Sequence, residues 1–103
     1  MNENDNPQEL SIELSEEVSE GTYSNLAIIT HSNTEFVLDF IRVMPGIPKA
    51  KVKSRIILTP EHAKRFIGAL QDNIEKYEKI NGKINTHEGP PFPMNFGGPA
   101  AEA

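Results

Sequence analysis

The sequence predicts one α+β domain, in which a four-stranded antiparallel sheet is followed by one long C-terminal helix, in the order β-β-β-β-α. Three observations predict this class. Four short segments before residue 59 have the composition or the alternation of strands. One segment after residue 59 repeats apolar residues every three or four positions, as an amphipathic helix does. The length of 103 residues supports a single small domain.

The two ends of the chain predict disordered tails around a domain that spans residues 9–84. Residues 1–8 are polar, form an acidic arm and contain a proline. Residues 85–103 are dense in proline and glycine, which interrupt helices and strands alike. Three apolar side chains alternate inside this C-terminal tail and would suit docking on a sheet edge or in a groove, an inert tail being the alternative. They are Phe92, Met94 and Phe96.

The strands are predicted from alternation and from turn residues. Glu9–Leu14 alternates apolar and polar residues and is the first predicted strand. Tyr23–His31 and Glu35–Met44 are rich in β-branched and aromatic residues, and the three polar residues between them favour a hairpin. Pro45–Gly46 predicts a turn, because proline presets φ and glycine accepts a positive φ. Lys49–Leu58 is therefore the fourth strand.

The helix has the clearest boundaries. Thr59 is a suitable N-cap residue, and Pro60 occupies the first helical position, where its missing N–H is not needed. Asn81 and Gly82 end the helix, since glycine readily adopts the conformation beyond the last turn. The helix therefore spans about 21 residues, or roughly 32 Å. Its apolar positions are Ala63, Phe66, Ile67, Leu70, Ile74, Tyr77 and Ile80.

Pairing the strands symmetrically about Gly46 predicts that Asp39 lies opposite Lys53, which makes an ordinary ion pair the simplest interpretation of this carboxylate. A three-residue turn at 32–34 sets Leu26 opposite Phe40, and the two pairings together place Ile29, Val37 and Ile41 on the sheet face that the helix does not cover. This face is too apolar to be left in water, so a second copy, the tail or another protein should cover it. We therefore expect a homodimer or a partner complex.

A basic stripe is the most informative polar feature. Period-two spacing predicts that four cations of the fourth strand share one side, within reach of a phosphate backbone. Single-strand binders usually add aromatic stacking platforms, and only Tyr23 is nearby. Protection of a sheet edge is an alternative role, and pairing with the acidic residues 1–20 is another. The four residues are Lys49, Lys51, Lys53 and Arg55.

Composition and motifs exclude several classes of chemistry. The chain has no cysteine, so it has no disulfide, no Cys-ligated metal and no thiol nucleophile. The three histidines lack the spacing of metal ligands, and no nucleophile elbow, phosphate-binding loop or dinucleotide fingerprint occurs. We expect no catalytic residues, metal or cofactor. No apolar run approaches a membrane span and no signal peptide is visible, which favours a cytoplasmic protein.

The stretches YSNLAIITHSNTEFVLDFIRVMPG (23–46) and RIILTPEHAKRFIGALQDNIEKYEKINGKI (55–84) resemble the bacterial and archaeal family known as domain of unknown function 3467. The resemblance implies a small soluble protein without an assigned activity, so it transfers no catalytic residues. Members are sometimes encoded beside genes for RNA polymerase large subunits, which implies a transcription setting with the polymerase as a partner.

Together these observations predict a non-enzymatic interaction protein whose partner is another protein. A single-stranded nucleic-acid-binding protein that uses the basic segment 49–55 is the alternative.

Overall fold

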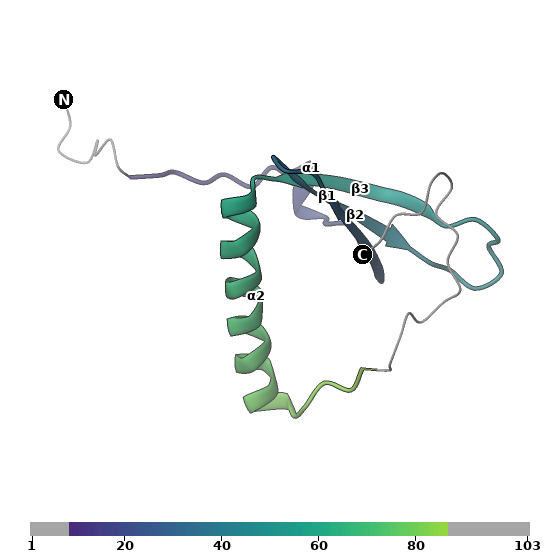
Figure 1. Cartoon of the computed structure of the whole chain (residues 1–103). Coiled ribbons are helices and arrows are strands. Elements are labelled where there is room, and N and C mark those ends of the chain that lie inside the picture. Colours follow the sequence, from purple (N-terminus) through teal and green to yellow (C-terminus); the bar gives the residue numbers. More distant parts are fainter. Residues whose placement is uncertain (1–8, 87–103) are drawn as a thin grey trace.

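The computed structural model describes residues 9–86 and confirms an α+β fold with an antiparallel sheet followed by a C-terminal helix (Figure 1). Within the described residues the sheet has three strands, in the order β1-β2-β3. One further helical turn precedes the sheet. The elements are α1 (Glu16–Ser19), β1 (Leu26–His31), β2 (Phe36–Arg42), β3 (Lys51–Leu58) and α2 (Pro60–Asn81).

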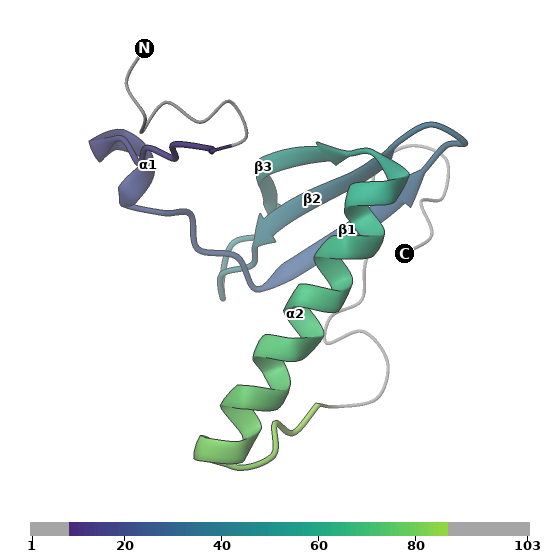
Figure 2. The same cartoon turned by 90° about the vertical axis from the view of Figure 1, so that its left-hand side faces the viewer.

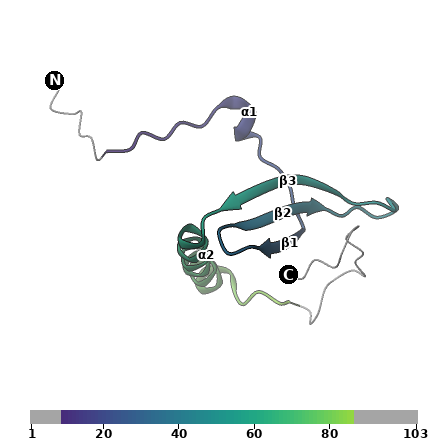
Figure 3. The same cartoon turned by 45° about the horizontal axis from the view of Figure 1, so that its top comes forward.

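The expected first strand, Glu9–Leu14, is wrong as part of this sheet. The segment forms no ladder with β1, β2 or β3 and extends past the end of the sheet at which α2 begins (Figures 1 and 3; Figure 2 gives the view along this direction). Its apolar side chains remain in solvent, with Leu10, Ile12 and Leu14 83%, 87% and 70% exposed. Alternation describes a chain that suits a sheet, but a strand exists only where a neighbouring backbone supplies its hydrogen bonds.

The β1–β2 hairpin is confirmed, with a register one residue away from the expected one. Leu26 lies opposite Ile41, where the symmetric three-residue turn predicts Phe40. The shift arises because Glu35 belongs to the loop, where its carbonyl accepts from the Ser32 backbone N–H at 2.9 Å. The Ser32 hydroxyl also accepts from the Glu35 N–H at 3.3 Å, which closes the turn.

The turn before β3 is confirmed, but β3 itself differs from expectation. The Ile47 N–H donates to the Met44 carbonyl at 3.3 Å, and Gly46 has φ +80°, as a type II turn requires. β3 begins at Lys51 rather than at Lys49. A register irregularity between Phe40 and Ile41 leaves Lys53 as an extra, unpaired residue, which is a β-bulge.

These registers redistribute side chains between the two faces. Residues opposite one another in an antiparallel pair share a face, so Val37 and Ile41 lie on one face while Ile29, opposite Leu38, lies on the other. The expected shared partner face of Ile29, Val37 and Ile41 is therefore wrong. The cause is the one-residue shift, which moves every β1 side chain to the other side relative to β2.

The core is thin and uses both faces of the sheet. Five residues of the described part are buried, and Asp39 is the one polar residue among them. Ile28 and Ile41 are buried on the face that carries Asp39, whereas Leu38 is buried on the opposite face. Leu58 at the end of β3 completes the set. No residue of α2 is buried.

Helix α2 confirms the predicted boundaries and has 22 residues. The Thr59 hydroxyl accepts a hydrogen bond from the His62 backbone N–H at 3.2 Å, and Pro60 occupies the first turn. Gly82, with φ +92°, ends the helix and donates its N–H to the Glu78 carbonyl at 2.9 Å. The helix starts directly after β3 and runs away from one end of the sheet (Figures 1 and 2).

A bidentate ion pair joins the two longer strands at mid-sheet. Arg55 donates from Nε to Asp39 Oδ1 at 2.6 Å and from an Nη to Oδ2 at 2.8 Å. Asp39 is 2% exposed, and the cation opposite it is Arg55 rather than the expected Lys53, because the loop before β3 and the bulge each shift the register by one residue. The hydrogen bonds from Arg55 lower the pKa of Asp39. Desolvation of the buried carboxylate raises this pKa, and the positive charge of Arg55 lowers it further, so that the net shift is downward.

We expect Asp39→Asn to lower the free energy of unfolding by about 1–2 kcal/mol at pH 7, because a charge-assisted bidentate pair is lost from a buried position. Because the pKa of Asp39 is lower in the folded than in the unfolded chain, the unfolded chain binds more protons as the pH falls. The stabilisation by the ion pair is therefore complete above the unfolded pKa of Asp39 and is lost as the pH falls through its folded pKa. Urea unfolding at pH 7, 5 and 3 should therefore show the two proteins converging below about pH 4.

The exposed carboxylate of Glu75 on α2 provides the control, since Glu75→Gln leaves the sheet intact. A difference between wild type and Asp39→Asn that is the same at pH 7 and pH 3 would contradict the ion-pair account.

We expect Thr59→Ala to destabilise the start of α2 by about 1 kcal/mol, since the His62 N–H loses its side-chain acceptor. Thr59→Ser keeps the hydroxyl and should cost a few tenths of that. Thermal unfolding followed by circular dichroism measures both variants, and equal losses for alanine and serine would rule out the cap.

Candidate interaction surface

Helix α2 carries an uncovered apolar stripe. We call it the α2 stripe and define it as Phe66, Ile67, Leu70, Ile74 and Tyr77. Their spacing of three and four places them on one side of the helix. Each is 38–55% exposed, although core helices of small domains normally bury such a side.

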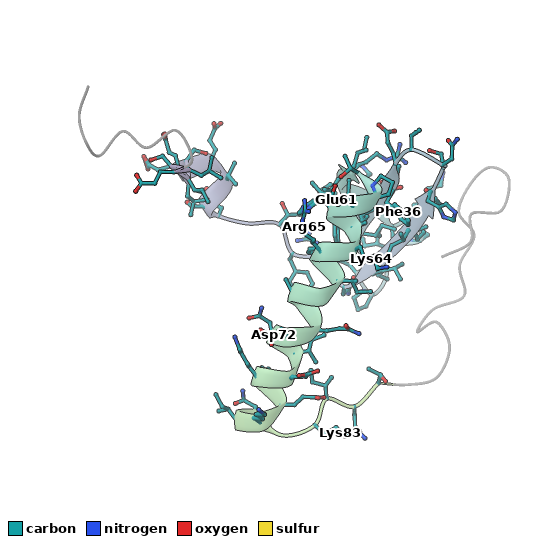
Figure 4. The ribbon with its side chains drawn as sticks, turned by 60° about the vertical axis from the view of Figure 1, so that its left-hand side comes forward. Phe36, Glu61, Lys64, Arg65, Asp72 and Lys83 are labelled. Atoms are coloured by element: carbon teal, nitrogen blue, oxygen red, sulfur yellow. The ribbon has the colours of Figure 1, made fainter. Side chains whose placement is uncertain are left out.

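The opposite side of α2 is charged and solvated. Glu61 pairs with Arg65, and Asp72 Oδ2 lies 3.1 Å from Lys76 Nζ, both at i,i+4 spacing (Figure 4). Exposed pairs of this type add only tenths of a kcal/mol each. They keep one side of the helix in water, so the uncovered apolar stripe is the side that remains available for a partner.

The chain turns back beside the stripe after the helix ends. The Ile84 N–H donates to Glu78 Oε2 at 2.9 Å, which holds the returning segment against the last turns. Ile84 then lines an open hollow together with Asn73, Ile74 and Tyr77. The C-terminal end of the stripe is thus an open apolar depression, with α2 on one side and Ile84 on the other.

The expectation that four basic residues share one side of a strand is wrong. Lys49 lies in the loop before β3, and Lys53 is the unpaired residue of the bulge. Lys51 lies opposite Arg42 on one face, whereas Arg55 lies opposite Asp39 on the other. The bulge is the physical reason, because an extra residue breaks the period-two alternation that the expectation assumed.

The structure instead brings four cations together at the end of the sheet where β2 turns into β3. We call Arg42, Lys49, Lys51 and Lys53 the loop-end cations; all four are exposed. In the described part of the chain none of them forms an ion pair with a carboxylate. Sequence reasoning missed Arg42, although counting outward from the Pro45–Gly46 turn would have placed it near Lys51.

The two histidines within residues 9–86 have local roles. The His31 ring stacks on Phe36 with centroids 5.3 Å apart. The backbone of His62 serves the cap of α2, as described above. Over residues 9–86 no group of three or more His, Cys, Asp or Glu side chains is arranged to hold a metal ion. In the same range, no helix combines the length and the apolar character that crossing a membrane requires.

The candidate docking residues of the tail, Phe92, Met94 and Phe96, lie outside the described residues. Their docking therefore stays a prediction from sequence, as does the role of the arm at residues 1–8.

Comparison with known proteins extends the resemblance noted from the sequence. A family model described as Protein of unknown function (DUF3467) matches residues 1–86, a wider range than the two stretches that carry the resemblance. Comparisons with curated proteins and with solved structures gave no significant match. Since the family match covers 86 of the 103 residues, the chain belongs to the DUF3467 family of proteins of unknown function.

Proposed function

We propose that this chain is a non-enzymatic interaction protein that binds a protein partner through the α2 stripe. The observation that carries the proposal is the exposure of five large apolar side chains on one side of a 22-residue helix. Large contiguous apolar patches on the surface of a soluble domain mark interaction sites.

The size of the stripe supports a binding role. Side chains of this kind present roughly 150–200 Å² each when free, so five of them at about half exposure leave on the order of 400 Å². This is the size of the largest patch on a typical monomer, and such patches are often functional. Here the patch lies on a small domain with five buried residues among those described. Leaving it in water lowers the stability of the domain unless a partner covers it.

The spacing of the stripe suggests the mode of binding. Leu70, Ile74 and Tyr77 stand at i, i+4 and i+7, which is the pattern of a helix that lays its apolar side into a groove. Tyr77 adds a hydroxyl at the edge of the contact, where a polar partner group can meet it. A partner with a shallow apolar groove or an apolar helix of its own fits this surface.

The proposal includes the cellular compartment and the first partner to test. A chain without cysteine suits a reducing compartment, and we place the protein in the cytoplasm. The family resemblance favours an association with the transcription machinery, with RNA polymerase as the partner to test first.

We expect Leu70→Glu and Ile74→Glu to weaken partner binding at least tenfold, because each puts a carboxylate into the centre of an apolar contact. Both residues are exposed in the protomer, so the fold should persist. Tagged full-length protein is purified from its native cells, co-purifying proteins are identified by mass spectrometry, and the stoichiometric partner is titrated against each purified variant.

Gly68→Glu supplies the matched control. It introduces the same carboxylate on the same helix but away from the stripe, and a Cβ at Gly68 meets no atom within 4 Å. Equal affinity of the wild type, Gly68→Glu and Leu70→Glu for the partner would contradict the proposal. A partner set without polymerase subunits would remove the transcription setting and leave the binding mode intact.

Single-stranded nucleic-acid binding is the second candidate, and one observation favours it. Arg42 and Lys51 lie directly opposite each other, although like charges in this position destabilise a sheet. An anion between them would remove that repulsion. Arg55 is less available than the sequence alone indicated, because Asp39 already engages its guanidinium.

If the loop-end cations contact four phosphates, log affinity should fall with log salt at a slope of about −2.8, taking roughly 0.7 per contact. Lys51→Gln should reduce the slope by about 0.7 and weaken all oligonucleotide sequences alike. Fluorescence anisotropy with single-stranded oligonucleotides from 50 to 300 mM salt measures this slope. Over this range the Debye length falls by more than twofold. Lys64→Gln on α2 is the control, and absence of binding at the lowest salt would exclude this candidate.

A further inference from the structure

The segment Glu9–Leu14 is built like a strand and has no sheet. Leu10, Ile12 and Leu14 alternate with polar residues along it, two of them acidic, and all three apolar side chains are exposed. Within the described residues, its backbone takes part in none of the hydrogen bonds that hold turns, loops and strands together. The segment therefore has the residue pattern of a strand but no neighbouring backbone to pair with.

The outer edge of β3 has the complementary defect. Because β2 is the central strand, one side of β3 has no strand beside it within the described chain. Lys51 and Lys53 are exposed on this strand, and so are Ile56 and Ile57. Lysines on an edge repel another basic edge, but they attract an acidic strand.

We propose that the segment Glu9–Leu14 of one chain adds to the outer edge of β3 in a second copy, and that the second copy returns the same contact. This segment, which follows residues 1–8 and is called the arm from here on, would supply the fourth strand of its partner's sheet. Glu9 and Glu13 lie on the face of β3 that carries Lys51, while the leucine and isoleucine side chains extend the apolar surface of Val52 and Ile57 on the other face. The result is a symmetric, strand-exchanged dimer.

The path of the chain favours a second copy over the chain's own edge. Asn25 is fastened to the sheet, with its side chain donating to the Val43 carbonyl at 3.0 Å and accepting from the Val43 N–H at 2.8 Å. Helix α1 follows toward the N-terminus, capped by the Ser15 hydroxyl and closed at Gly21, which has φ +78°. The arm then runs outward past the end of the sheet at which α2 begins, and within the described residues it forms no ladder with its own β3 (Figures 1 and 3).

This inference uses a different surface from the α2 stripe, so the two stand or fall separately. Sedimentation velocity of the full chain at micromolar concentration should show a dimer. Ile12→Pro should abolish it, because proline removes an N–H and does not fit within a paired strand. Ile12→Val is the matched control and should keep it, and Leu70→Glu on the α2 stripe should also leave it unchanged.

A charge exchange tests whether the contact joins two chains. The arm variant carries Glu9→Lys and Glu13→Lys, and the edge variant carries Lys51→Glu and Lys53→Glu. Each variant alone should dimerise about tenfold more weakly, since every cross-strand charge pair becomes repulsive. An equimolar mixture should regain wild-type dimerisation, because in the mixed dimer both arms again face an edge of opposite charge.

Three results would overturn the proposal. The first is a stable monomer at micromolar concentration. The second is a dimer that Ile12→Pro leaves unchanged, which would place the contact on another surface. The third is the absence of recovery on mixing, which would show that the arm of one chain does not lie beside β3 of the other.

Discussion

The contact between Asp39 and Arg55 determines most of what lies around it. A buried carboxylate on the central strand needs a partner that can satisfy both of its oxygens, and the planar guanidinium does so from the neighbouring strand. This fixes the β2–β3 register at mid-sheet. The bulge at Lys53 then absorbs the extra residue between this pair and the Pro45–Gly46 turn. This register also sets which of the loop-end cations lie opposite each other, namely Arg42 and Lys51.

The sheet and α2 belong to one chain but share little packing. α2 begins at the end of β3 and leaves the sheet, so the helix has well-formed caps and an uncovered apolar side at the same time. Local interactions are sufficient to start and stop a helix, whereas its stability in a protein comes mainly from covering its apolar side. The fold therefore presents a helix that is formed and still able to bind.

Within the described residues three features lack a partner, and two of them share Lys51 and Lys53. The α2 stripe lacks an apolar cover, the loop-end cations lack anions among the described residues, and the outer edge of β3 lacks a strand. Among the described residues, the segment Glu9–Leu14 complements one of these features, since its charge and its alternation both suit β3. A protein that pairs by arm exchange would keep the α2 stripe free for a different partner.

The sequence by itself determined the elements whose signals are local. Thr59, Pro60 and Gly82 specify both ends of α2, and Pro45–Gly46 specifies a turn, because these residues act through their own backbone geometry. The tertiary structure decided the registers, the division of faces and the number of strands. A single loop residue, Glu35, and a single bulged residue, Lys53, reverse which side chains are neighbours, and neither has a signal in composition or period. The segment Glu9–Leu14 shows the same limit, because pairing depends on a neighbouring backbone that alternation cannot supply.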